Sequence, residues 1–292
     1  MRVRFGGVER RGPAVDLRDV DVTAQTVERA VRDPDDDRVT AAPRPSAGPV
    51  PDGAAALHER VGFLHQEMSV ATVPAVAAAA RSWGATTEYD AALRRLTAEI
   101  AAVEVPAVDL AAARERVAET AADVDRLRER VARAGGRVEA VRDGSGDADG
   151  AEADLADATR ELAERETEYH AAREALSAAR ERAREARDAR ERRLRLEDRR
   201  GNRWRAARRD LADAYADSFC RAVDALGVPG TPVRPRDFDG PDWAAACAVA
   251  RLARPGAPVV LADSLAGRAG GSFETASRAR AALASPVLLV EV

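Results

Sequence analysis

The chain has 292 residues, a formal net charge of −4 at pH 7, 33% charged residues and only 4% aromatic residues. Because every basic residue is Arg, the sequence excludes Schiff-base chemistry, a catalytic Lys and the Lys of a P-loop. Two cysteines without a C-x-x-C motif exclude a disulfide framework and a cysteine zinc site. This composition suits long, solvated helices rich in Ala, Glu and Arg.

The sequence shows no targeting or membrane segment. The N-terminal residues lack the apolar core of a signal peptide, and no run of eighteen apolar residues occurs. We therefore expect a soluble cytoplasmic protein that spans no membrane. The modest negative charge provides no field that would draw the whole protein to nucleic acid.

Residues 1–84 predict the N-terminal part of a small α/β head. A strand at 2–5 and a returning strand at 14–17 flank the turn offered by Gly6-Gly7. A short helix is expected from Thr23 to about Val31, where valines form a stripe.

Residues 42–53 contain four prolines and two glycines, which predicts a linker or an exposed loop. Two helices are expected between 54 and 82. A further helix should begin near Thr87 and Asp90, which form a plausible N-terminal cap, and Pro106 should break or kink it.

A heptad register over the next segment predicts one arm of a coiled coil. Apolar or small residues recur at two interleaved sets of positions: Leu110, Val117, Val124, Val131 and Val138, with Ala113, Thr120, Leu127, Ala134 and Val141. A second register then predicts a returning arm: Leu155, Leu162, Tyr169, Leu176 and Ala183, with Ala158, Ala172, Ala179 and Ala186.

An acidic, Gly-rich turn at 143–150 separates the two registers. The pattern therefore predicts a long antiparallel coiled-coil hairpin over 85–226, with its tip at 143–150. The second arm is expected to continue unbroken to about Leu226.

Residues 227–292 predict the C-terminal α/β part of the head. A turn-rich segment at 227–241 precedes a helix at 243–252, a strand at 258–262, a helix at 273–283 and a strand at 286–290. Continuous apolar strands that alternate with helices argue for a small parallel sheet covered by helices.

The segment DFDGPDWAAACAVARLARPGAPVVLADS resembles the ABC-ATPase segment of the SMC, Rad50 and RecF group. In that resemblance, residues 239–242 stand at the signature loop and Asp263 ends a degenerate Walker B strand. The resemblance implies a Mg²⁺-binding role for Asp263 and a hairpin inserted between two halves of a head. The whole chain also resembles an uncharacterised coiled-coil family of salt-adapted archaea, which implies no activity.

The chain departs from the ABC pattern at several positions. No G-x-x-x-x-G-K-[ST] occurs near residues 1–50, Ser264 replaces the catalytic Glu, and Pro241 replaces the second signature Gly. No switch His follows the last strand, which ends at Glu291. These departures predict a protein that is not an enzyme, with no catalytic residues, no cofactor and no metal site.

An Arg-rich stretch at 180–209 holds fourteen Arg against six acidic residues. One interpretation is a solvated helix laced by Glu–Arg pairs. The other is a nucleic-acid contact that follows a phosphate backbone. The candidate contacts are Arg192, Arg193, Arg199, Arg200, Arg203 and Arg205.

The sequence thus predicts a mainly α protein, with a long antiparallel coiled-coil hairpin and a small α/β head built from both chain ends. The expected function is that of a non-catalytic coiled-coil scaffold or interaction protein, an SMC-like or Rad50-like accessory whose partner is another protein or a second copy. The alternatives are nucleic-acid binding through 180–209 and a degenerate ABC-type half-site that needs a P-loop partner.

Overall fold

The computed structural model describes residues 1–33, 35–41, 54–142, 144 and 147–291. The chain forms two compact units: an α/β unit of Met1–Arg94 with Arg200–Val292, and a helical unit of Arg95–Arg199. The expected loop at 42–53 and part of the expected turn at 143–150 lie outside the described residues.

The α/β unit is built around a four-stranded parallel sheet. Its strands are β3 (Ala14–Asp16), β5 (Phe63–Leu64), β6 (Val259–Ala262) and β7 (Val287–Val290), in the order β3-β7-β6-β5. The two central strands come from the C-terminal part of the chain and the two edge strands from the N-terminal part. The parallel sheet expected from the C-terminal pattern is confirmed, and neither part of the chain can form it alone.

A second, antiparallel sheet contains β1 (Arg2–Phe5), β2 (Val8–Arg11) and β4 (Val39–Thr40), in the order β2-β1-β4. The expected pairing of 2–5 with 14–17 is therefore wrong. Gly6 and Gly7 both adopt positive φ, so the chain reverses at once into β2. This tight turn leaves β3 free to pair with β7.

Alternate residues of the central strands point to opposite faces of the parallel sheet. On one face, Val260 and Leu288 pack against α1 (Ala24–Arg32) and β1. On the other face, Val259 and Leu289 pack into the larger core. The helices that contribute to that core are α2 (Ala54–Val61), α3 (Thr72–Ser82), α7 (Ala216–Leu226), α8 (Asp242–Leu252) and α9 (Ala276–Leu283), and α6 (Ala148–Ala214) adds Ala212 near its C-terminal end.

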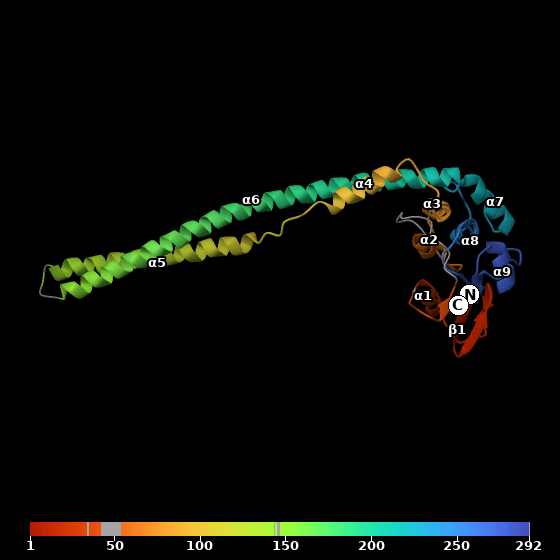
Figure 1. Cartoon of the computed structure of the whole chain (residues 1–292), viewed down its shortest axis with the longest axis horizontal. Coiled ribbons are helices and arrows are strands. Elements are labelled where there is room, and N and C mark those ends of the chain that lie inside the picture. Colours follow the sequence, from red (N-terminus) through yellow and green to blue (C-terminus); the bar gives the residue numbers. More distant parts are fainter. Residues whose placement is uncertain (34, 42–53, 143, 145–146, 292) are drawn as a thin grey trace. The chain divides into compact units, whose positions relative to one another are not determined.

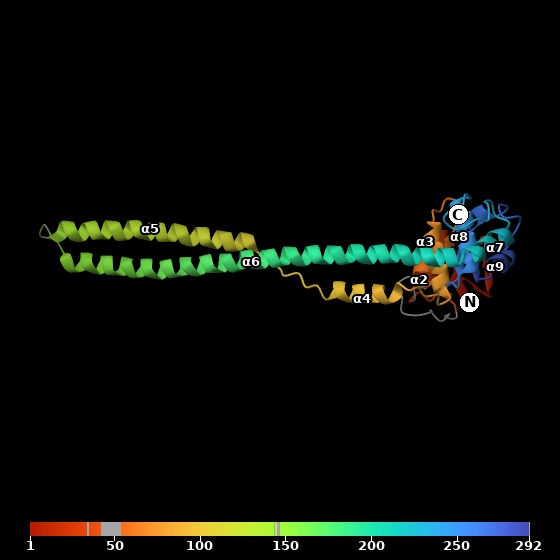
Figure 2. The same cartoon turned by 90° about the horizontal axis from the view of Figure 1, so that it is seen from above.

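Three helices carry the segment between the two halves of the α/β unit: α4 (Asp90–Ala101), α5 (Leu110–Arg142) and α6 (Ala148–Ala214). Residues 103–109, around Pro106, are not helical, as expected. In both views, α5 lies beside α6 (Figure 1 and Figure 2). Every heptad position predicted on these two helices is buried or half-buried.

Ion pairs join residues 128–142 of α5 to residues 152–166 of α6. The pairs are Arg128–Glu166 (2.9 Å), Arg130–Glu161 (2.7 Å), Arg137–Asp154 (3.1 Å) and Arg142–Glu152 (2.8 Å). As the residue number rises on α5 it falls on α6, so the two helices run antiparallel. Each pair is exposed and contributes roughly 0–1 kcal/mol, so the buried heptad positions supply most of the stabilisation.

Two expected elements differ in the structure. The expected continuous arm to Leu226 is wrong, because α6 ends at Ala214 and a separate helix, α7, starts at Ala216. Leu57, Val61 and Leu64 have the spacing of one helix face, which predicts that all three lie on one helix. In the structure, α2 ends at Val61 and Leu64 belongs to the strand β5. Among the described residues, no helix combines the length and apolar character needed to cross a membrane.

A buried ion pair fixes the start of α4. Arg81 and Asp90 form two hydrogen bonds of 2.6 Å, and their side chains are 3% and 6% exposed. Asp90 also accepts from the backbone N–H and the hydroxyl of Thr87. The Arg81 guanidinium lowers the pKa of Asp90 to about 2, so this carboxylate stays charged at neutral pH.

His58 is buried between α2 and the start of β6. Its Nε2 lies 3.0 Å from the carbonyl oxygen of Pro258, so the neutral ring donates a hydrogen bond there. Burial lowers the pKa of His58 below its ordinary value of 6.5. The folded protein therefore holds this ring uncharged.

We expect the free energy of unfolding to fall as the pH drops below about 6.5. Since the unfolded chain binds the proton more readily, the stabilisation is present above the unfolded pKa and is lost on acidification through the lower, folded pKa. Chemical denaturation at a series of pH values measures this loss. His58→Gln should reduce the pH dependence, whereas His170→Gln at an exposed site should not; equal pH profiles in all three proteins would contradict the assignment.

Candidate functional site

The carboxyl ends of the four parallel strands meet at one edge of the sheet, where ligands bind in open α/β folds. The chain places a charged or ionisable residue directly after three of them: His65 after β5, Asp263 after β6 and Glu291 after β7. Arg18 is the second residue after the end of β3. This edge is the candidate site because chain segments far apart in sequence bring polar side chains together there.

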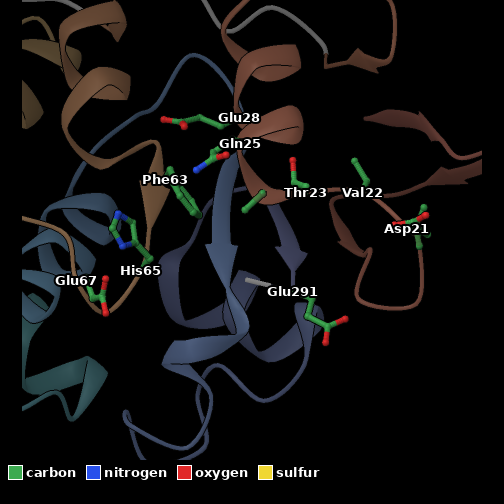
Figure 3. A pocket seen from close by; sticks show the side chains of 11 residues that line it. Asp21, Val22, Thr23, Gln25, Glu28, Phe63, His65, Glu67 and Glu291 are labelled. Carbon is green, nitrogen blue, oxygen red and sulfur yellow. The ribbon is translucent and has the colours of Figure 1, made fainter.

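Two adjoining hollows lie at this edge, and Glu291 lines both. The larger hollow has a volume of about 840 Å³ and is shown in Figure 3. Its lining residues are Val20, Asp21, Val22, Thr23, Ala24, Gln25, Glu28, Phe63, His65, Glu67 and Glu291. The smaller hollow, of about 570 Å³, is lined by Arg10, Asp16, Arg18, Asp19, Asp263 and Glu291.

Carboxylates dominate the larger hollow. Figure 3 shows His65 and Glu67 near each other in the segment after β5, and Glu28 above them on α1. The rings of Phe63 and His65 lie 4.7 Å apart. Glu28 is paired with Arg32 at 2.7 Å. None of the described residues that line this hollow is an arginine, and four of them are acidic: Asp21, Glu28, Glu67 and Glu291.

The two arginines of the smaller hollow are already paired with carboxylates. Arg10 donates to both oxygens of Asp19, at 2.8 and 2.6 Å, and Arg18 donates to Asp16 at 2.6 Å. The hydrogen bonds from these guanidinium groups lower the pKa of Asp19 and of Asp16. Asp263 adds a further negative charge near Arg18. Neither guanidinium is left uncompensated for an anionic ligand.

Backbone donors of the loop from β3 to α1 bind within the fold. A phosphate cradle needs backbone N–H groups that point at the anion. Here the N–H of Leu17 donates to Leu289, that of Arg18 to the Asp16 carboxylate, and that of Val20 back to Leu17. These three donors hold the loop against the sheet and are not directed at a ligand.

Asp263 lies where the sequence predicts a Walker B residue, directly after β6 and beside β7. Its carbonyl accepts from Ala266 at 2.7 Å and closes a short 3₁₀ turn. Within the described residues, no three His, Cys, Asp or Glu side chains gather closely enough to hold a metal ion. The metal role implied by the resemblance therefore has no set of ligands around Asp263 in this part of the chain.

The segment at 239–242, which the resemblance places at a signature loop, serves local structure. Asp239 accepts from the N–H of Thr231 at 2.8 Å, and Asp242 accepts from the Ser69 hydroxyl at 2.8 Å. Gly240 lies against the ring of Phe238. These residues hold a loop and the start of α3 in place.

Three of the six arginines predicted as nucleic-acid contacts have partners on the protein. Arg193 pairs with Glu197 at 2.9 Å, and Arg205 donates to Asn202 at 2.5 Å. The guanidinium of Arg203 lies 5.7 Å from the centre of the Tyr89 ring. These three side chains are held by protein groups.

The other three, Arg192, Arg199 and Arg200, have no carboxylate or ring partner among the described residues. All six arginines lie on α6, and Arg200 alone is half-buried while the others are exposed. The Glu–Arg ion pairs expected along this stretch therefore form at some arginines, but not at Arg192, Arg199 or Arg200 among the described residues.

Sequence reasoning missed the larger hollow. Its acidic residues Asp21, Glu28, Glu67 and Glu291 come from four separate segments, and β5, which positions His65 and Glu67, has two residues. A two-residue strand is too short to show an alternating pattern. The usable signal was the polar residue that directly follows each apolar strand.

Gly240→Ala should destabilise the fold by about 1–3 kcal/mol, because a Cβ there would overpack the loop. That atom would lie 2.4 Å from Cζ of Phe238 and 2.6 Å from the carbonyl oxygen of Pro229. Gly201→Ala in α6, where no atom lies within 4 Å, is the matched control and should stabilise by about 0.5–1 kcal/mol. Urea denaturation measures both, and an unchanged stability in Gly240→Ala would contradict the packing described.

The chain matches the model of the Family of unknown function (DUF7856) over residues 12–287. No curated protein and no solved structure matches the chain.

Proposed function

We propose that this protein, which belongs to the Family of unknown function (DUF7856), is a non-catalytic coiled-coil scaffold. In this proposal, α5 and α6 form an antiparallel coiled-coil hairpin that presents helical faces to a partner. The α/β unit acts as the head, assembled from both chain ends, and docks to another protein or to a second copy. The proposal includes an SMC-like or Rad50-like accessory role.

The ion pairs between α5 and α6 are the observation that carries this proposal. Arg128–Glu166 and Arg142–Glu152 are fourteen residues apart on each helix, so cross-helix ion pairs extend over about four helical turns. Buried positions before and between these pairs follow the spacing of a coiled-coil seam, as Val124, Leu127 and Ala134 illustrate. Long paired helices of this kind hold partners at a distance and need no reaction chemistry.

The carboxyl edge of the sheet supports a role without nucleotide chemistry. The N–H groups of Leu17, Arg18 and Val20 are used within the fold. Arg18 and Arg10 are paired with Asp16 and Asp19, and Ser264 follows Asp263. An anionic nucleotide would meet carboxylates there, and like charges repel.

A second candidate function is nucleic-acid binding through the Arg-rich part of α6. The observation that favours it is the number of exposed arginines without a partner, of which Arg192 and Arg199 belong to the predicted set. A phosphate backbone would supply the missing counter-charge.

A third candidate is a degenerate ABC-type half-site completed by a P-loop partner. The observation that favours it is the place of Asp263, at the carboxyl end of β6 and beside the parallel strand β7. This candidate requires a partner that carries G-x-x-x-x-G-K-[ST] and contributes the missing phosphate cradle.

Purified protein should show no ATP hydrolysis above the buffer rate, because Arg10 and Arg18 at the carboxyl edge are already paired with Asp19 and Asp16. A phosphate-release assay on the wild-type chain and on Asp263→Ala measures this. Hydrolysis by the wild type that disappears in Asp263→Ala would overturn the non-catalytic proposal. Hydrolysis that persists in Asp263→Ala and copurifies with the chain would also overturn the proposal and would place the activity away from Asp263.

A further inference from the structure

We propose that Arg180, Arg184, Arg187 and Arg190 form a basic stripe on α6 that binds the phosphate backbone of double-stranded nucleic acid. The inference rests on the nucleic-acid binding proposed above and names its location and its ligand. All four residues lie in the helical unit, and all four side chains are exposed.

The spacing of the basic stripe places its members on one side of the helix. Residues three or four apart are neighbours on a helix surface, and the four arginines follow one another at steps of four, three and three. The stripe therefore extends for about 15 Å along α6 at 1.5 Å per residue. The helix is continuous through this region, so the side chains keep their spacing when they bind.

Three acidic residues flank the basic stripe within this segment. Glu181, Glu185 and Asp188 each come one residue after a helix position on or beside the stripe, and one residue turns the chain by about 100°. Glu181 and Asp188 are three and four residues from Arg184, which is the spacing of helix ion pairs. Among the described residues, however, neither forms an ion pair with Arg184.

None of the four arginines has an ion pair or a ring contact among the described residues. Their neighbours further along α6 behave differently, since Arg193 pairs with Glu197 and Arg195 pairs with Glu191. On α5, arginines such as Arg130 reach across to α6. The basic stripe is therefore a set of guanidinium groups whose counter-charge the folded chain does not supply.

The surroundings of the stripe favour a polyanion over an acidic protein. Protein interfaces depend on apolar or aromatic anchors in their centre. The stripe has no such anchor, and the exposed large apolar residue of α6, Leu194, lies beyond its end. Phosphate oxygens need only guanidinium donors, to which Arg presents a planar fork.

The absence of aromatic side chains from the stripe favours a duplex over a single strand. Single-stranded nucleic acid is held by stacking of its bases on aromatic rings. The aromatic residues of α6 lie outside the stripe, and the nearest on the N-terminal side, Tyr169, carries Arg173 against its ring. A duplex offers its phosphates without any need for stacking.

The test is fluorescence anisotropy with the full chain and a mixed-sequence DNA duplex over a series of salt concentrations. The variant combines Arg180→Gln, Arg184→Gln, Arg187→Gln and Arg190→Gln. The control combines Arg94→Gln, Arg95→Gln, Arg114→Gln and Arg116→Gln, which removes the same charge from exposed arginines on α4 and α5. Circular dichroism checks that all three proteins are equally helical.

We expect the wild type and the control to bind the duplex, with affinity that falls as salt rises. The stripe variant should bind more weakly, and the slope of log affinity against log salt should be smaller by about 3.6, or about 0.9 for each of the four contacts. Binding to a single strand of the same sequence should be weaker than binding to the duplex.

Each opposite result overturns a defined part of the account. If the wild type fails to bind even at low salt, both the nucleic-acid function and the stripe are wrong. If the wild type binds and the stripe variant binds equally well, or if the control loses as much affinity, the function stands and the stripe is wrong. Tighter binding to the single strand than to the duplex would refute the assignment of a double-stranded ligand. Polyglutamate that displaces the duplex as well as unlabelled duplex does would refute the assignment of a phosphate backbone.

Discussion

The parallel sheet depends on strands from both ends of the chain, and this requirement constrains the rest of the structure. β7 and β6 occupy its centre, yet β3 and β5 close its two edges, and roughly two hundred residues separate β5 from β6. The intervening segment must therefore leave and return. Antiparallel pairing of α5 with α6 accomplishes that return, because cross-helix ion pairs and buried heptad positions hold the two helices together.

The same topology explains the polar edge of the α/β unit. Parallel strands present all their carboxyl ends on one side, so residues such as His65, Asp263 and Glu291 gather there although they are distant in sequence. In this chain, the gathered groups are mostly carboxylates, and both nearby arginines are paired with aspartates. The fold provides a place for a ligand, but its chemistry is unfavourable for an anionic nucleotide.

The long helices could be predicted from the sequence because their signal is repeated many times. Val124, Leu127 and Val138 each fall on a heptad position and each is buried. The break at Pro106 and the Thr23 cap of α1 were also predictable, since each depends on one residue whose backbone or side-chain chemistry is specific.

The short strands and the hollows could not be predicted, for physical reasons. β5 is too short for a periodic pattern, and the partner of β3 is a strand at the other end of the chain. The larger hollow arises where segments from both parts of the sequence converge. The sequence alone could not show that Arg184 and Arg187 lack ion pairs. Nearby Glu residues suggested ion pairs that these side chains do not form among the described residues.

The most direct test of the antiparallel arrangement is a distance measurement between spin labels on α5 and α6, in a chain with Cys220 replaced by Ser. Labels at Ala132 and Thr159, both exposed, should lie close, because packed helix axes are about 8–10 Å apart. Labels at Ala132 and Ser177 should be farther apart, since Ser177 lies about 27 Å from Thr159 along α6. A long distance between Ala132 and Thr159 in the monomeric protein would contradict the pairing.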